Sequence, residues 1–252
     1  IRRSIRSCSC QFENLTMIVA IHQPEAFPWL GFFHKLYLAD IFVILDTVQF
    51  EKNNVQNRNK ILISGRPGWL TIPIQSHPSS AKIQDIKINW EDPTIKKHLT
   101  TLRQNYGKHP YAKEVFEFLE MHYNKKYEYL ADFNTDFILF MKDRLGITTK
   151  IVKASELKLT GSSRGGTEVT LELCKVLGAK MYLSGSGAKT YLKVSEYDQA
   201  GIKVVFQQFE HPQYAQHKNQ DFIPHLSILD LYLNHGPESL ACILQGNWDK
   251  IK

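Results

Sequence analysis

The sequence lacks any run of about 18 apolar residues, the length that a membrane-spanning helix needs, and it is poor in cysteine. Cys8 and Cys10 lie near the first residue, while Cys174 and Cys242 stand singly in helix-like segments. No CxxC pair occurs, so neither a disulfide framework nor a zinc ribbon is expected. The simplest inference is a reducing, cytoplasmic compartment.

Several familiar catalytic motifs are also missing. There is no HExxH, and the ten histidines are too scattered to name a metal site. The serines lack the GxSxG context of a nucleophile elbow. The segment 184–191 resembles a phosphate loop, but Ala188 precedes Lys189 where the Walker motif requires glycine. These absences exclude the commonest metalloprotease, hydrolase and P-loop signatures.

A strong basic balance is absent as well. The formal charge is +6, and residues 1–16 contribute a net +2 of it, which leaves a mild +4 for residues 17–252. Without a basic run, nucleic-acid binding is not expected. The charge is compatible with an anionic small-molecule substrate, either a nucleotide or an activated sugar. The sequence does not predict an oligomeric state.

The chain is long and apolar enough to build one large core, with 252 residues of which 43% are hydrophobic. We expect residues 1–16 to be a non-native or disordered leader, because Met17 directly precedes the first strand-like run. Residues 17–252 are then predicted to form a single α/β domain, with a helical insertion at about 92–146.

Residues 18–21 and 41–45 are short, fully apolar runs, as in strands buried on both faces of a sheet. Residues 29–39 between them have helical spacing, so a right-handed βαβ unit is predicted. The predicted fold class is α/β, with a mainly parallel Rossmann-like sheet and flanking helices. Further strands are expected at 69–74, 83–88, 149–152, 181–183 and 202–206, and further helices at 167–176, 226–234 and 237–245.

Ligands of open parallel sheets bind beyond the carboxyl ends of the strands. Three loops meet that condition, at 22–31, 46–58 and 184–189, and we expect them to converge. His22 follows the first strand, and a functional role is favoured because a polar side chain beside Pro24 has little packing reason to be there. His34 either joins it in binding phosphates or only packs on a helix face.

The second loop offers Asp46, Asn57 and Arg58. A carboxylate at a strand end holds Mg²⁺ or a ribose hydroxyl in many proteins, and in others it caps the next turn. Asn57 and Arg58 could orient a carboxylate or phosphate, or belong to a solvated loop. The cofactor is therefore unknown, with a nucleoside triphosphate and Mg²⁺ as one candidate.

The third loop, with Ser184, Gly185, Gly187, Lys189 and Tyr191, could present backbone N–H groups to an anion, although its glycines could simply allow a turn. Later in the chain, His211 is a candidate acid or base. Further candidate binding residues are Gln23, Lys35, Tyr214, Gln216 and Asp230.

These residues, taken in order, resemble the WbqC-like family, whose members begin with a strand, His-Gln-Pro and an aromatic segment. The resemblance covers nearly everything from residue 17 to about 236. Thr47 stands where the family pattern implies a second acid after Asp46, which weakens the expectation of Mg²⁺ binding. The matching residues are His22-Gln23-Pro24, Phe27-Pro28-Trp29-Leu30-Gly31, Phe33, Lys35, Asp40, Asp46, Gln49-Phe50, Gln56-Asn57-Arg58, Tyr182-Leu183-Ser184-Gly185, Gly187-Ala188-Lys189, Tyr191-Leu192, His211-Pro212, Tyr214, Gln216, Ser227-Ile228 and Asp230.

The resemblance implies a role in O-antigen or other surface-polysaccharide biosynthesis. The first hypothesis is a transferase or ligase that moves an acyl, aminoacyl or nucleotidyl group and involves an activated sugar or nucleotide. In it His22, His34 and Lys189 hold phosphates, and Asp46 and Arg58 orient the substrate. The second hypothesis is a non-catalytic nucleotide-sugar-binding subunit of a biosynthetic complex, in which no residue needs a tuned pKa.

Overall fold

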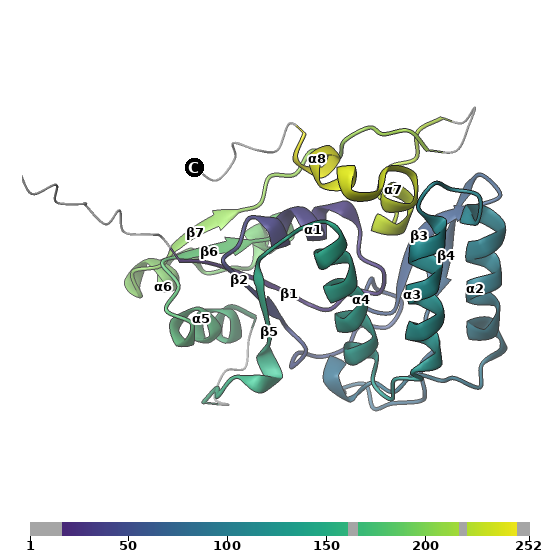
Figure 1. Ribbon diagram of the computed structural model, residues 1–252. Coiled ribbons are helices and arrows are strands. Elements are labelled where there is room, and N and C mark those ends of the chain that lie inside the picture. The colour runs from purple at the N-terminus through teal and green to yellow at the C-terminus, as the bar shows by residue number, and fades with distance from the viewer. Residues whose placement is uncertain (1–16, 161–165, 217–220, 246–252) are drawn as a thin grey trace, which may run out of the picture.

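The computed structural model describes residues 17–160, 166–216 and 221–245, and its centre is a five-stranded sheet (Figure 1). The strand order is β5-β2-β1-β6-β7, and every neighbouring pair is parallel. The strands are β1 (Ile18–His22), β2 (Ile41–Ile44), β5 (Lys150–Lys153), β6 (Met181–Ser184) and β7 (Lys203–Phe206). The prediction of a mainly parallel, Rossmann-like α/β fold is confirmed.

The central strand β1 is buried on both faces, as its β-branched sequence predicts. Successive side chains alternate between faces, so Ala20 packs in one hydrophobic cluster, while Val19 and Ile21 pack in the other. Helix α1 (Leu30–Tyr37) belongs to the first cluster, and α5 (Gly166–Val176) and α6 (Val194–Gln199) belong to the second. Helices therefore cover both faces of the sheet (Figure 1).

The other helices gather beside the sheet and on the α1 face (Figure 1). Asp92 caps the first of them by accepting a hydrogen bond from the backbone N–H of Thr94 at 2.8 Å. Within the described part of the chain, no helix is long and apolar enough to cross a membrane. These helices are α2 (Pro93–Tyr106), α3 (Ala112–Asn124), α4 (Leu130–Arg144), α7 (Ile228–His235) and α8 (Ser239–Leu244).

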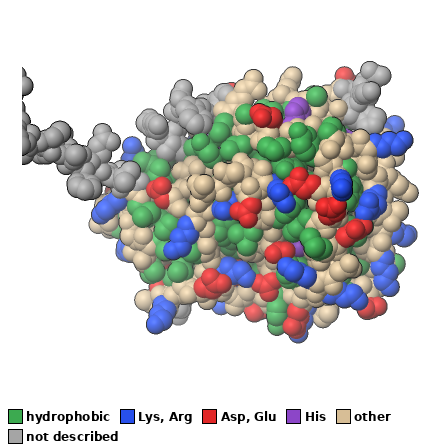
Figure 2. All heavy atoms as spheres, in the orientation of Figure 1, with side chains coloured by type: hydrophobic (Ala, Val, Ile, Leu, Met, Phe, Trp, Pro, Cys, Tyr) green, Lys and Arg blue, Asp and Glu red, His purple; other side chains and the backbone are tan. Residues whose placement is uncertain are grey.

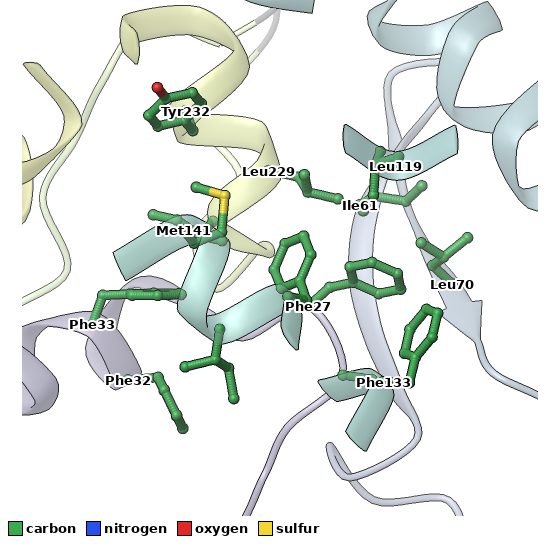
Figure 3. Packing of buried hydrophobic residues seen from close by; sticks show 14 of the residues in the cluster. Phe27, Phe32, Phe33, Ile61, Leu70, Leu119, Phe133, Met141, Leu229 and Tyr232 are labelled. Carbon is green, nitrogen blue, oxygen red and sulfur yellow. The ribbon is translucent and has the colours of Figure 1, made fainter. Parts of the chain in front are cut away.

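The helices predicted at 92–146 pack on the loop that follows β1. Phe27 is fully buried, and its ring meets the rings of Phe133 and Phe137 edge-on, with centroids 5.9 and 4.8 Å away. Figure 3 shows Phe27 beside Phe133, with Leu229 of α7 also in this packing. The helical segment thus shapes the loop after β1, while the single-domain organisation stays a prediction.

Two element predictions are wrong in detail. Residues 83–88 do not form a strand: they begin with a 3-10 turn, η1 (Ile83–Asp85), and Lys87 and Ile88 make only isolated bridges, to Tyr129 and Ile74. Arg58 does not lie in a loop: it begins β3 (Arg58–Ile63), which pairs antiparallel with β4 (Arg66–Thr71). Ser64 and Gly65 make the tight turn, with φ values of 50° and 76°.

Two buried histidines of the helices make stability depend on pH. Burial lowers the pKa of both His98 and His122 from 6.5 to about 4. Their pKa values lie below those of the unfolded chain, so the unfolded state takes up protons first as the pH falls from 6.5 to about 4. Stability from these groups is present above pH 6.5 and lost on acidification, on the order of 3 kcal/mol for each histidine.

Urea denaturation at pH 7.5, 6, 5 and 4 measures this dependence. We expect the free energy of unfolding to fall across the series, and to fall less steeply in His98→Gln. An identical slope in the variant would contradict the assignment to His98.

Candidate functional site

The chain leaves the carboxyl ends of β1 and β6 toward opposite faces of the sheet, because α1 covers one face and α6 the other. Such a switch of direction opens a crevice between the two strand ends, which is where open α/β sheets bind ligands. A cavity of about 290 Å³ lies there. Its lining residues are Ile21, His22, Gln23, Lys35, Leu45, Thr170, Tyr182, Ser184, Gly185, Gly187, Ala188 and Tyr191, and we call it the β1/β6 cleft.

Lys35 reaches the β1/β6 cleft from α1 and is 2% exposed. Its Nζ donates a hydrogen bond of 2.7 Å to the backbone oxygen of Ile21, near the end of β1. Burial lowers the pKa of Lys35 to about 7, and the nearby Glu25 carboxyl opposes a larger fall. A cleft-lining amine thus exchanges its proton near neutral pH.

Glu25 was not among the residues predicted from the sequence, although it is the acid closest to the cleft histidine. It is 2% exposed, and its Oε1 lies 3.7 Å from Nδ1 of His22. Burial raises the pKa of Glu25 to about 8, against the opposing effects of Lys35 and of the Trp29 backbone N–H. A glutamate among apolar and aromatic neighbours, between Pro24 and Ala26, was the available signal.

His22 lines the β1/β6 cleft, and its predicted role there stays a prediction. Its Nδ1 lies 3.1 Å from the backbone oxygen of Gln23, and its ring meets Phe32 edge-on at 5.2 Å. Burial, and then the positive charge of Lys35, lower its pKa well below the usual range. The imidazole is therefore neutral at physiological pH and can exchange hydrogen bonds with a ligand without carrying charge.

The loop that carries Gln23 is held by two buried amides that the sequence did not single out for this role. Gln56 donates to Oε1 of Gln23 at 2.6 Å. Asn134 of α4 donates to the backbone oxygens of Pro24 and Gln56, at 3.2 and 2.8 Å. The helices therefore fix the β1 side of the cleft, and only the fold brings these residues together.

The β6 side of the cleft contains four of the predicted loop residues, Ser184, Gly185, Gly187 and Tyr191. The loop turns tightly as η3 (Ser186–Thr190), and the side chain of Tyr191 is 63% exposed. Lys189 is exposed and does not line the cleft; its Nζ lies 5.6 Å above the Phe206 ring. The loops after β1 and β6 thus meet at the cleft, whereas no residue of the third predicted loop, 46–58, lines it.

Asp46 follows β2, outside the set that lines the cleft. Its Oδ1 accepts from the backbone N–H of Ser155 at 3.0 Å, and its Oδ2 accepts from the Ser155 hydroxyl at 2.6 Å. Both oxygens therefore hold the turn after β5, and the residue fits poorly as a Mg²⁺ ligand. The described residues also contain no group of three His, Cys, Asp or Glu side chains placed to hold a metal.

Asn57 and Arg58 also lie outside the cleft lining. Asn57 is buried and donates to the backbone oxygen of Ile72 at 3.2 Å. The Arg58 guanidinium lies 4.2 Å from the centre of the Trp69 ring, as a cation–π pair across the β3–β4 hairpin. These contacts hold the two strands of the hairpin to each other at its open end.

The two remaining histidines lie apart from the cleft. His34 is fully buried, with Nδ1 3.0 Å from the Gln207 amide. His211 accepts from the backbone N–H of His225 at Nε2, at 3.1 Å, while its Nδ1 lies 2.8 Å from the Pro212 oxygen. The pKa of His211 is lowered, chiefly by burial. Catalytic roles for both stay predictions, and neither side chain lines the cleft.

One hydrogen-bond network contains Asp230, Tyr214 and Gln216. None of these three residues is among those that line the β1/β6 cleft. The Asp230 carboxylate is fully buried and accepts from Tyr214 and Tyr106 at 2.9 Å each, and from Gln216 at 3.2 Å. Burial raises its pKa, although all three donors oppose the rise. The network joins α2, the 211–216 segment and α7.

Comparisons with known proteins give one family and one close relative. The profile of the WbqC-like protein family matches residues 23–242. Rv1507c of Mycobacterium tuberculosis (strain ATCC 25618 / H37Rv), which is described as uncharacterized, is 31% identical over 225 residues. That alignment covers 88% of this chain and 95% of the relative. No solved structure gives a significant match.

Proposed function

Because the chain belongs to the WbqC-like family, we propose that it is a transferase or ligase of surface-polysaccharide biosynthesis, and that it binds an activated sugar or nucleotide in the β1/β6 cleft. The observation that carries the proposal is the position of the cleft, at the point where β1 and β6 lead to opposite faces of the sheet. Neutral imidazole, amide, amine and hydroxyl groups meet there, and no carboxylate is among the described residues that line the cleft.

The lining suits the anionic part of such a ligand. Lys35 and His22 offer N–H groups from the β1 side, and the loop that follows Ser184 offers backbone N–H groups from the β6 side. Tyr191, largely exposed at the cleft, offers a ring and a hydroxyl for a sugar or a base. In this account the transferred group is acyl, aminoacyl or nucleotidyl.

Thermal unfolding with added ligand tests the binding. We expect one of ATP, UDP-N-acetylglucosamine or inorganic pyrophosphate to stabilise the protein by about 2.7 kcal/mol at a concentration of 100 Kd, which corresponds to a rise in Tm of roughly 5–10 °C. His22→Ala should fold and lose this rise. His77→Ala, a histidine outside the cleft lining, is the matched control and should keep it.

If the ligand still raises the Tm of His22→Ala, the ligand binds outside the β1/β6 cleft. Turnover separates the enzyme from a non-catalytic subunit: a nucleoside triphosphate consumed only in the presence of an amino-sugar acceptor supports a transferase or ligase. Tight binding without turnover would support the binding subunit.

A further inference from the structure

We propose that Lys35 is the general base of the transfer step, and that Glu25 is the positioning residue that tunes its basicity. The inference rests on the proposed function, because it assigns a proton acceptor to that reaction. It goes further by identifying the substrate that loses the proton as an acceptor with a hydroxyl or amine nucleophile. It also gives a role to Glu25, which sequence reasoning missed.

The hydrogen bonding of Lys35 favours the uncharged amine. An ammonium group has three N–H donors, and among the described residues the recorded partner of Nζ is the backbone oxygen of Ile21. Glu25 acts on Lys35 electrostatically, but the two side chains do not form an ion pair, because no carboxyl oxygen of Glu25 lies within 4.0 Å of the Lys35 amine. A buried charge without a close partner is costly, whereas an amine with one hydrogen bond and a lone pair is tolerated.

The charged and titratable groups around the amine are His22 and Glu25 on the β1 side, and Tyr182 and Tyr191 on the β6 side. His22 is a poor proton acceptor, because its pKa is lowered far below neutrality. The pKa of Tyr182 is raised by burial, so it stays protonated. Lys35 is the cleft residue whose proton affinity matches the working pH, the condition under which a general base is most effective.

The step balances without a further reactant. The acceptor's O–H or N–H proton passes to the lone pair of Nζ, and the freed electron pair forms a bond to the carbonyl carbon or phosphorus of the activated group. The bond from that atom to the phosphate-type leaving group breaks, and the leaving group keeps the electron pair. The Lys35 ammonium then returns its proton to the leaving group or to solvent. The Glu25 carboxyl, which gives up its own proton near the same pH, stabilises the ammonium in between when it is ionised.

The experiment is an NMR titration of the full chain labelled with 13C-lysine, following the Cε signals from pH 5 to 11. Lys35→Met assigns the Lys35 signal by its loss, and Lys35→Gln serves if the first variant does not fold. We expect this signal to titrate with a midpoint near 7, against about 10.4 for ordinary lysines. Glu25→Gln should shift it downward, because it removes a carboxyl that ionises near the same pH and favours the ammonium when it does.

A turnover profile completes the test, since a purely structural lysine would leave it unmoved. The acid limb of kcat/KM should coincide with the Lys35 midpoint, and both should move down together in Glu25→Gln. A Lys35 midpoint near 10 would overturn the proposal and make the residue a permanent cation that binds anions. An acid limb that stays in place while the midpoint moves would also overturn it. Neither result touches the ligand-binding test of the proposed function.

Discussion

Lys35→Met is expected to lower turnover by about 10²–10⁴-fold, the usual contribution of a general base, while the free energy of unfolding stays within about 1 kcal/mol of the parent. Methionine matches the length of the lysine stem and keeps its packing in α1. The lost hydrogen bond to the Ile21 oxygen is worth about 1 kcal/mol.

Steady-state kinetics and urea denaturation of the same preparation measure the two quantities. Lys87→Met is the matched control: Lys87 pairs with Glu128 and does not line the cleft, so both its activity and its stability should change little. If Lys35→Met unfolds the protein or turns over at the parent rate, Lys35 is a structural residue and the assignment is wrong.

Asp230→Ala is expected to destabilise the protein by about 3–5 kcal/mol, because about 1–3 kcal/mol is lost for each buried hydrogen-bond donor left without its acceptor. The substitution removes the acceptor of three hydrogen bonds, which come from the hydroxyls of Tyr106 and Tyr214 and from the amide of Gln216. Tyr106 also accepts from the backbone N–H of Leu62 at 2.7 Å, so the loss extends to β3.

Tyr214→Phe is the graded comparison for this network: it removes the hydroxyl that donates to Asp230 at 2.9 Å and accepts from Gln216 at 3.4 Å, and it should cost about 1 kcal/mol. Urea denaturation gives both values. At temperatures where Asp230→Ala is still folded, its affinity for the cleft ligand should equal that of the parent. Unchanged stability with lost affinity would instead place Asp230 in the binding site, as the sequence prediction had it.

The sequence predicts the sheet well because its strands have a distinctive local pattern. Residues 18–21 and 41–45 are short apolar runs, and β-branched side chains in such runs favour buried parallel strands. Strand β3 was missed because its polar residues, such as Arg58 and Lys60, resemble a solvated loop, whereas the strand expected at 69–74 overlaps β4. The signal of the hairpin was the Ser64-Gly65 turn, where both residues adopt positive φ.

The site was predictable where it depends on chain order and not where it depends on packing. His22 and Ser184 could be placed because each follows or ends a strand, and strand ends meet at one edge of a parallel sheet. The proximity of Glu25 and Lys35 could not be predicted, since the burial of both side chains depends on how α1 packs on the sheet. Asp46 looked like a ligand residue because its partner, Ser155, is remote in sequence.

On the face in Figure 2, Lys and Arg side chains are interspersed with Asp and Glu, without a broad basic area. Such a mixed surface agrees with the mild net charge and favours recognition within a cleft over recognition across a charged face.

The most direct test of the account is a crystal structure of the full chain soaked with the ligand that gives the largest rise in Tm. The account predicts that its anionic group lies between the loops 22–31 and 184–191, within hydrogen-bond distance of His22 or Lys35. Density for the ligand in the separate hollow lined by Ser64, Asn105 and His109, with an empty β1/β6 cleft, would contradict it.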